Sequence, residues 1–169
     1  MAQLFVISAP SGTGKTSLIH KVLEEELASK TKLGVSCTTR ERRENEEEGV
    51  AYFFLDEDAF NKKLDEGNFL EHAKVFGNLY GTPKDWVVST ISQGFDVVLE
   101  LDVQGAIQVK NAYPEAKTIF IIPPSYKDLE KRLVNRDQDS QETIEKRLSE
   151  AKQEVLSGKD FDHLITNDN

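Results

Sequence analysis

Eight consecutive residues near the start of the chain have the types and spacing that bind phosphate. Gly12 and Gly14 let the backbone turn its N–H groups toward an anion, at the positive end of a helix dipole. Lys15 would then bridge two phosphates, and the Thr16 hydroxyl would bind Mg²⁺. The segment matches G-x-x-x-x-G-K-[ST] except that Ala9 replaces the first glycine, which costs little where φ is negative. The candidate triphosphate-binding residues are Ala9, Pro10, Ser11, Gly12, Thr13, Gly14, Lys15, Thr16 and Ser17.

The elements around this segment are those of an α/β protein. Residues 4–7 form a short apolar run typical of a buried strand, and helical spacing of apolar residues follows to about Ser29. Residues 97–102 and 119–122 form two further buried-strand runs, each followed by a helical pattern. Strands that alternate with helices predict a three-layer fold with a parallel sheet.

Residues 33–82 interrupt this alternation and are interpreted as a small mixed α/β insertion. Short alternating runs at 35–39, 52–55 and 69–76 surround one helix at 57–66, which Asp56 can cap and Gly67 can end. The next helix is predicted to begin with Thr82 as its N-cap and Pro83 at its first position.

Composition narrows the class of protein. The chain has 169 residues, one cysteine and a formal net charge of −9. A single domain without disulfides is expected. The acidic balance argues against nucleic acid or a membrane surface as a partner. No signal peptide or membrane span is predicted, so a cytoplasmic location is expected. Monomer or homo-oligomer stays open.

Arginines gather in two places despite the acidic balance. Arg40, Arg42 and Arg43 form one cluster, and a looser one follows near the C-terminus. Guanidinium groups bind phosphate with bidentate geometry, so both clusters are candidates for phosphate binding. The second cluster consists of Arg132, Arg136 and Arg147.

Several further motifs occur together with the phosphate segment: residues 36–43, Tyr52, residues 69–73, residues 77–82, residues 102–105 and Arg147. In this combination the chain closely resembles the guanylate kinases of bacteria, in register from Leu4 to Asp168. The resemblance implies a P-loop nucleoside monophosphate kinase fold. It implies Mg²⁺-dependent transfer of the ATP γ-phosphoryl group to GMP or dGMP, giving ADP and GDP in purine nucleotide metabolism.

The resemblance also assigns the acceptor residues. The GMP phosphate would be held by Arg40, Arg43, Tyr52 and Tyr80, and the guanine would be read by Ser36, Glu71 and Thr82, with Asp102 nearby. A carboxylate at Glu71 accepts the N1–H and N2–H donors of guanine, whereas adenine presents an acceptor there.

On the donor side, the resemblance places Arg132, Arg136 and Arg147 on the triphosphate and Asn167 near the adenine. Stabilisation of the transferring group is assigned to Lys15, Arg40, Arg136 and Arg147, and the metal to Thr16, with Glu100 and Asp102 acting through water. The core would comprise residues 1–32 and 83–169, with a lid at about 125–147, and residues 33–82 would bind GMP. The family's C-terminal helix is expected to be absent.

Several residues of these segments also have simpler structural interpretations. Glu44, Glu46, Glu47 and Glu48 are interpreted as a solvated loop, and Cys37 as a packing residue. Two alternative functions remain: a kinase of another nucleoside monophosphate, and a related interaction domain that binds phosphopeptides. The intact glycines, Lys15 and Thr16 argue against the interaction domain, and Glu71 argues against another acceptor base.

Overall fold

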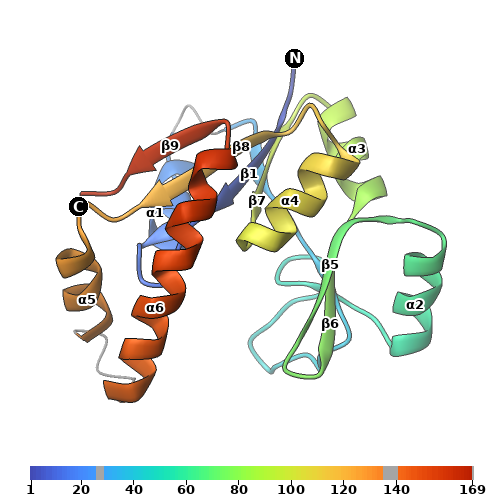
Figure 1. Cartoon of the computed structure of the whole chain (residues 1–169). Coiled ribbons are helices and arrows are strands. Elements are labelled where there is room, and N and C mark those ends of the chain that lie inside the picture. The colour runs from blue at the N-terminus through green and yellow to red at the C-terminus, as the bar shows by residue number, and fades with distance from the viewer. Residues whose placement is uncertain (26–28, 135–140, 169) are drawn as a thin grey trace.

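The computed structural model describes residues 1–25, 29–134 and 141–168, apart from the side chains of residues 133 and 141–147. Two β-sheets with helices around them make up the described chain (Figure 1). The larger sheet has the strand order β2-β7-β1-β8-β9, and its strands pair in parallel. Its strands are β1 (Leu4–Ser8), β2 (Thr31–Leu33), β7 (Asp96–Glu100), β8 (Lys117–Ile122) and β9 (His163–Thr166).

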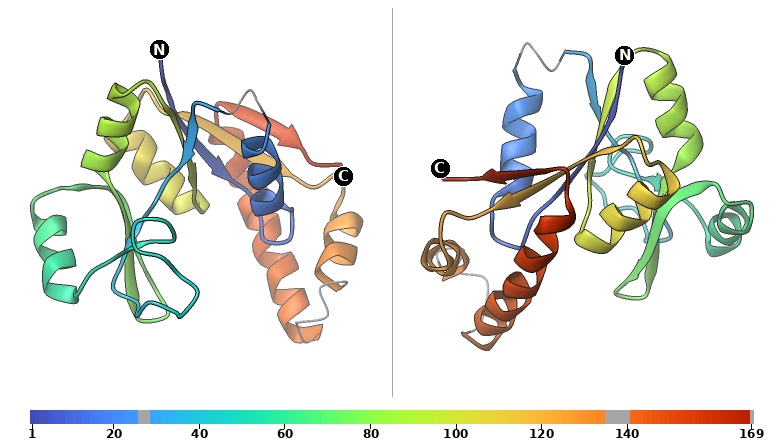
Figure 2. Two further views of the ribbon diagram at one scale, coloured as in Figure 1. Left: turned by 180° about the vertical axis from the view of Figure 1, so that it is seen from behind. Right: turned by 45° about the horizontal axis from the view of Figure 1, so that its top comes forward.

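Helices cover both faces of the larger sheet. Helix α1 (Lys15–Leu23) lies on one face, whereas α4 (Val103–Ala112) and α6 (Gln141–Ser157) lie on the other (Figures 1 and 2). Helix α3 (Lys84–Ser92) packs against β7. The predicted three-layer α/β class with a parallel sheet is therefore confirmed.

The interior of this sheet is apolar because its central strands are covered from both sides. Leu4 and Val6 of β1 pack with Val97 and Leu99 of β7, and all four are almost fully buried. In the register of the two strands, Ile7 pairs with Glu100. The segments that leave β1 and β7 therefore emerge side by side at the carboxyl edge of the sheet, where ligands bind in folds of this kind.

The insertion forms the second sheet, with the strand order β4-β3-β6-β5. A hairpin of two longer strands dominates it, and one helix packs on it (Figure 1). A small separate core of Cys37, Phe60 and Phe69 holds helix and sheet together. Burial raises the pKa of the Cys37 thiol to about 11, in keeping with its interpretation as a packing residue. The elements are β3 (Cys37–Thr38), β4 (Phe53–Phe54), α2 (Glu57–Asp65), β5 (Phe69–Val75) and β6 (Asn78–Pro83).

The first helix ends earlier than its apolar spacing predicted. Helix α1 stops at Leu23, and Glu24 and Glu25 follow in a turn. Acidic side chains at this end oppose the negative pole of the helix dipole, which explains the early stop. The remainder of the predicted helix includes residues 26–28, which lie outside the described part of the chain.

The predicted start of α3 was also wrong. Thr82 and Pro83 are the last residues of β6, and Pro83 has the extended conformation of an N-cap (φ −69°, ψ 122°). The Thr82 hydroxyl does not cap the helix, because it donates to Glu71 across the hairpin instead. The Thr82 hydroxyl thus bonds to Glu71, eleven residues away, instead of to the backbone at the start of α3.

Helix α5 (Tyr126–Val134) packs against α6 (Figure 1). Ser125 caps α5 as predicted, because its Oγ accepts from the backbone N–H of Asp128 at 3.1 Å. Leu129 of α5 and Ala151 of α6 form a small buried cluster separate from the main core. No helix among the described residues combines the length and hydropathy needed to cross a membrane.

Candidate nucleotide site

The phosphate loop, residues 9–16, connects the end of β1 to the start of α1. Gly12 and Gly14 have φ values of 87° and 88°, which suit glycine and strain other residues. At Gly14 a Cβ would lie only 2.9 Å from Nδ2 of Asn167. Phe76 is the only non-glycine residue with positive φ in the described chain, so Ala9 fits at the first glycine position without strain.

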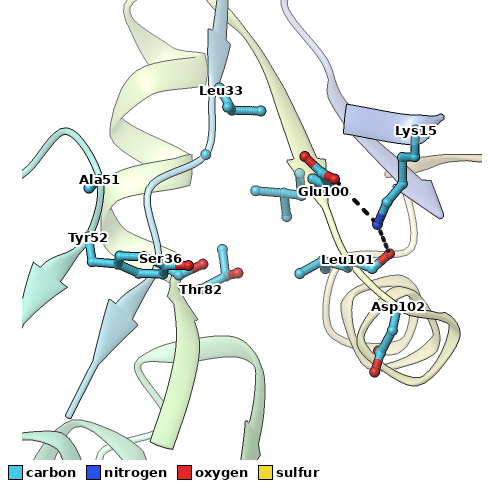
Figure 3. A pocket seen from close by; sticks show the side chains of 11 residues that line it. Lys15, Leu33, Ser36, Ala51, Tyr52, Thr82, Glu100, Leu101 and Asp102 are labelled. Atoms are coloured by element: carbon cyan, nitrogen blue, oxygen red, sulfur yellow. Dashed lines mark hydrogen bonds and ion pairs between the residues drawn. The ribbon is translucent and has the colours of Figure 1, made fainter. Parts of the chain in front are cut away.

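Lys15 points across the loop toward the end of β7 (Figure 3). Its Nζ donates to the carbonyl of Leu101 at 3.0 Å and lies 3.7 Å from Glu100 Oε1. Burial lowers the pKa of the Lys15 ammonium, while Glu100, Asp102 and Glu154 act in the opposite direction. The side chain is thus held at the carboxyl edge of the sheet among acidic groups.

Thr16 and Glu100 offer oxygen atoms that suit a magnesium ion. The Thr16 hydroxyl donates to Glu100 Oε1 at 2.5 Å. Mg²⁺ takes oxygen ligands and is usually held by one or two protein groups together with substrate phosphates and water. Asp102 is partly engaged, because its Oδ1 accepts from Gly105 N–H at 2.7 Å and caps α4. Within the described residues no cluster of three or more His, Cys, Asp or Glu could hold a metal alone.

The other side of the loop is tied to the C-terminal part of the chain. The carbonyl of Thr13 accepts from Asn167 Nδ2 at 2.8 Å and from Arg132 Nη1 at 3.1 Å. Arg132 also donates to the carbonyl of Asn167 at 3.0 Å. The structure therefore brings to the loop two residues that were predicted to bind ATP, Arg132 and Asn167. Arg136 lies outside the described residues, and Arg147 lies on α6 with its side chain outside them.

A central cavity of about 400 Å³ joins the core to the insertion (Figure 3). Lys15, Glu100 and Leu101 line it from the core, and Ser36 and Tyr52 line it from the insertion. The remaining residues around it are Leu33, Gly34, Ala51, Thr82, Leu99 and Asp102. Of the eight predicted acceptor residues, the structure brings Ser36, Tyr52, Thr82 and Asp102 to this cavity.

Glu71 is not among the residues that line this cavity, but it is hydrogen-bonded to Thr82, which lines it. Its side chain is only 6% exposed, and its Oε1 accepts from the Thr82 hydroxyl at 2.7 Å. Burial raises the pKa of the Glu71 carboxyl, and the nearby charge of Asp102 acts in the same direction. A buried carboxylate with so few partners has acceptor capacity left for a ligand.

Arg40 is held by an acid and by aromatic rings. Its Nη2 lies 2.7 Å from Glu46 Oε1, and its guanidinium lies 5.4 Å from the centre of the Tyr52 ring. The Tyr52 and Tyr80 rings meet edge to face at 5.9 Å. Arg43 is exposed, although its backbone N–H donates to Glu46 Oε2 at 2.9 Å. Arg40, Tyr52 and Tyr80 thus lie together, and Arg43 joins them through Glu46.

Sequence reasoning missed the roles of Glu46 and Glu48 within their acidic run. Glu46 accepts from the Arg40 guanidinium and from the Arg43 backbone N–H, and the hydrogen bond from Arg40 is the main cause that lowers the pKa of Glu46. Glu48 Oε2 accepts from the backbone N–H of Phe54 at 3.1 Å. The run is a loop, as interpreted, and Glu48 is exposed, but the specific hydrogen bonds of these two residues were not predicted. The signal available was the spacing of Glu46 from two arginines.

Gly105 lies close to two acidic side chains of the site. A Cβ there would lie 3.3 Å from Asp102 Oδ1 and 3.5 Å from Glu71 Oε2. Its N–H donates to Asp102 Oδ1, through which Asp102 caps α4. The glycine therefore leaves room beside two acidic side chains of the site.

Comparison with known proteins gives a consistent result. The sequence matches the guanylate kinase family over residues 1–169. A guanylate kinase of Hahella chejuensis is 50% identical over 166 residues, which cover 98% of this chain and 79% of that protein. A guanylate kinase of Coxiella burnetii is 49% identical over 168 residues, covering 99% and 81%. The crystal structure of guanylate kinase from Anaplasma phagocytophilum aligns with a TM-score of 0.70 at 31% identity, over 99% of this chain and 78% of that one.

Proposed function

The chain belongs to the guanylate kinase family, and from this premise we propose how its residues divide the transfer of a phosphoryl group from ATP to GMP. The observation that carries the proposal is the central cavity. Lys15 of the phosphate loop reaches it from one side, and Ser36 and Tyr52 of the insertion reach it from the other. A donor phosphate and an acceptor phosphate bound to these two parts would meet there.

ATP would bind at the phosphate loop, with its β- and γ-phosphates on the backbone N–H groups and Lys15. Asn167 and Arg132 support this placement, since both hold the loop through the Thr13 carbonyl. Thr16 would hold Mg²⁺, and Glu100 would do so through water, because both oxygens face each other beside the loop. When bound, the metal neutralises charge on the phosphates.

The GMP phosphate would bind to Arg40, Arg43, Tyr52 and Tyr80. Two guanidinium groups and two phenolic hydroxyls provide enough donors for a dianion. Glu46 pre-positions Arg40 with a charge-assisted hydrogen bond, which reduces the freedom that binding would otherwise remove.

The base would be read by Glu71, Ser36 and Thr82. The carboxylate of Glu71 can accept from both guanine N–H donors, and the hydrogen bond from the Thr82 hydroxyl fixes its orientation. Such a site favours GMP and dGMP over AMP, whose base offers an acceptor in that place.

Transfer requires little covalent chemistry from the protein. An oxygen of the GMP phosphate forms a bond to the γ-phosphorus, and the bond from that phosphorus to the β-phosphate oxygen breaks, leaving ADP and GDP. The attacking oxygen is already anionic, so no general base is needed. Lys15 and the arginines position the two phosphates in line and stabilise the charge of the transferring group.

Residues 33–82 would form the GMP-binding part, and the lid would lie at about residues 125–147, which include α5 and the start of α6. Each has a small core of its own, around Phe60 in the insertion and around Leu129 in the helices. Parts with separate cores can move relative to the main sheet, and closure would exclude water from the phosphates.

A coupled assay of ADP formation tests the function. ATP and Mg²⁺ are offered with GMP, dGMP, AMP, CMP, UMP and dTMP in turn. Turnover with GMP and dGMP alone is expected, whereas turnover with another nucleotide would overturn the base assignment. Lys15→Ala should abolish turnover, and Lys21→Ala, an exposed lysine on the same helix, should not. A folded protein without turnover on any acceptor would favour a binding role.

A further inference from the structure

Helix α4 of the core packs against strand β5 of the insertion, and one side chain of the helix bonds to the backbone of the strand. The side-chain Oε1 of Gln108 accepts from the backbone N–H of His72 at 3.2 Å. Its Nε2 donates to the backbone carbonyl of His72, also at 3.2 Å. One amide therefore satisfies both backbone groups of a residue that lies 36 positions away in the sequence.

These two hydrogen bonds lie on the open side of the strand. β5 is at one end of the strand order and pairs only with β6 in the described chain. In an antiparallel pair, the N–H and C=O of every second residue point away from the partner strand. At His72 both groups meet Gln108, so the amide takes the place that a neighbouring strand would fill.

Glu71, to which the proposed function assigns the guanine base, directly precedes His72 in β5. The register of β5 and β6 shifts between Phe69 and Glu71, and Leu70 is left without a partner residue on β6. Bulges of this kind bend a strand and re-aim side chains next to active sites. Leu70 is buried in the main core, whereas Phe69 belongs to the core of the insertion. Glu71 thus lies where the two cores meet, just beyond an irregular step in the ladder.

The face of α4 that carries Gln108 also lies beside the Glu71 carboxylate. Gly105 and Gln108 are three residues apart on the helix, which places them on one face. A Cβ at Gly105 would lie 3.5 Å from Glu71 Oε2. The Thr82 hydroxyl donates to the other oxygen, Oε1, at 2.7 Å. The carboxylate is therefore held from β6, and the backbone next to it is held from α4.

We propose that Gln108 is a positioning residue for base specificity, which fixes the backbone beside Glu71 so that the carboxylate meets both N–H donors of guanine. The inference rests on the proposed function, since it assigns the base to Glu71. Gln108 does not contact the nucleotide and acts through β5. Because two hydrogen bonds to one carboxylate require closer alignment than one, a shift of β5 should weaken recognition of the 2-amino group of guanine.

The test compares initial rates with GMP and, at high enzyme concentration, with inosine monophosphate, whose base lacks the 2-amino group. Gln108→Met removes both hydrogen bonds and keeps the length of the side chain. The ratio of kcat/KM for GMP to kcat/KM for inosine monophosphate should fall roughly 3- to 10-fold, as expected for the loss of one hydrogen bond. KM for ATP should be unchanged, because the bonds of Gln108 are to the insertion.

The matched control is Gln93→Met. Gln93 is exposed at the end of α3, and its Nε2 donates to Ser89 Oγ at 3.2 Å. The control therefore removes a surface amide bond of the same length that does not involve β5, and it should leave the ratio unchanged. Thermal melting confirms that each variant is folded. Should Gln108→Met not fold, Gln108→Asn, which keeps the amide but shortens its reach, is expected to give the same fall.

A double variant shows whether Gln108 acts through Glu71. In Glu71→Gln the carboxylate that accepts from the 2-amino group is gone, so adding Gln108→Met should change the ratio little further. An equal fall in both backgrounds would overturn the inference, because Gln108 would then act by another route.

The other outcomes separate the inference from the proposed function. An unchanged ratio in Gln108→Met, or a rise in KM for ATP as large as that for GMP, would make Gln108 a structural link between α4 and β5 and would overturn the inference alone. An unchanged ratio in Glu71→Gln would overturn the base assignment of the proposed function, and the inference with it.

Discussion

The buried carboxylate of Glu71 makes a sharp prediction, because its two expected effects have opposite signs. In Glu71→Gln the amide is nearly isosteric with the carboxylate. Its Oε1 can still accept from Thr82, which now stands 2.7 Å from the carboxylate. The NH₂ group then takes the place of Oε2 beside Gly105, where it faces guanine donors with donors of its own.

The magnitude follows from the hydrogen bonds that are lost. Bonds to a charged acceptor contribute about 1.5–3 kcal/mol each, and the amide retains a weaker neutral bond. We expect a loss of ~1–3 kcal/mol in transition-state stabilisation, so that kcat/KM for GMP falls roughly 5- to 150-fold. KM for ATP should stay the same, because the loop lies on the other side of the cavity.

The stability of the folded protein, in contrast, should increase in Glu71→Gln. Burial raises the pKa of Glu71, so the ionised form destabilises the fold at pH values above that pKa. Removal of the charge should therefore stabilise the ligand-free protein at pH 7.5 and raise its Tm. The gain should vanish at acidic pH, where Glu71 is protonated in both the folded and the unfolded protein.

The assay compares Glu71→Gln with Glu115→Gln, an exposed glutamate in a turn. Initial rates against GMP and thermal melts with and without GMP are sufficient. Unchanged kcat/KM for GMP would remove Glu71 from base recognition. A Tm that falls or stays constant at pH 7.5 would refute the argument from burial.

Two further predictions concern ion pairs. Glu46→Gln should raise KM for GMP about 3- to 10-fold, because Arg40 loses the charged bond that positions it; an equal rise in KM for ATP would contradict this. Asp162 accepts from the Thr118 N–H and hydroxyl and pairs with Lys110 at 2.9 Å, which lowers the pKa of Asp162. Its contribution to stability is present above about pH 4 and is lost as the pH falls toward the lowered pKa. Asp162→Asn should therefore cost about 1–2 kcal/mol at pH 7 and less at acidic pH in denaturant titrations, and a constant difference would count against it.

The strands and the phosphate loop could be predicted because their signals are local. Residues 4–7 are a continuous apolar run, and the structure places β1 at Leu4–Ser8. The glycines of the loop follow at once, and both have the positive φ that their type permits. Asp56 caps α2 through the backbone N–H of Ala59, at the position its type and place indicated.

The errors arose where a distant partner or a charge changed a local preference. Thr82 has the type of an N-cap, but Glu71 takes its hydroxyl. Glu46 lies in a run of acidic residues, yet its carboxylate accepts from the Arg40 side chain and the Arg43 backbone. The apolar spacing that continues beyond Leu23 does not extend α1, because acidic residues follow it. Only the partner of Thr82 lies outside its neighbouring sequence; Arg40 and Arg43 lie within six residues of Glu46, and Glu24 and Glu25 directly follow Leu23.

Strand β9, at the edge of the larger sheet, affects how rigidly the phosphate loop is held. It lies at one end of the strand order, pairs only with β8 in the described chain, and its four residues are exposed. Strands of this kind open first in local unfolding. Asn167 follows directly and holds the Thr13 carbonyl, so each opening of the strand also releases the loop. By thermodynamic linkage, a nucleotide that binds the ordered loop must also slow hydrogen exchange along this strand.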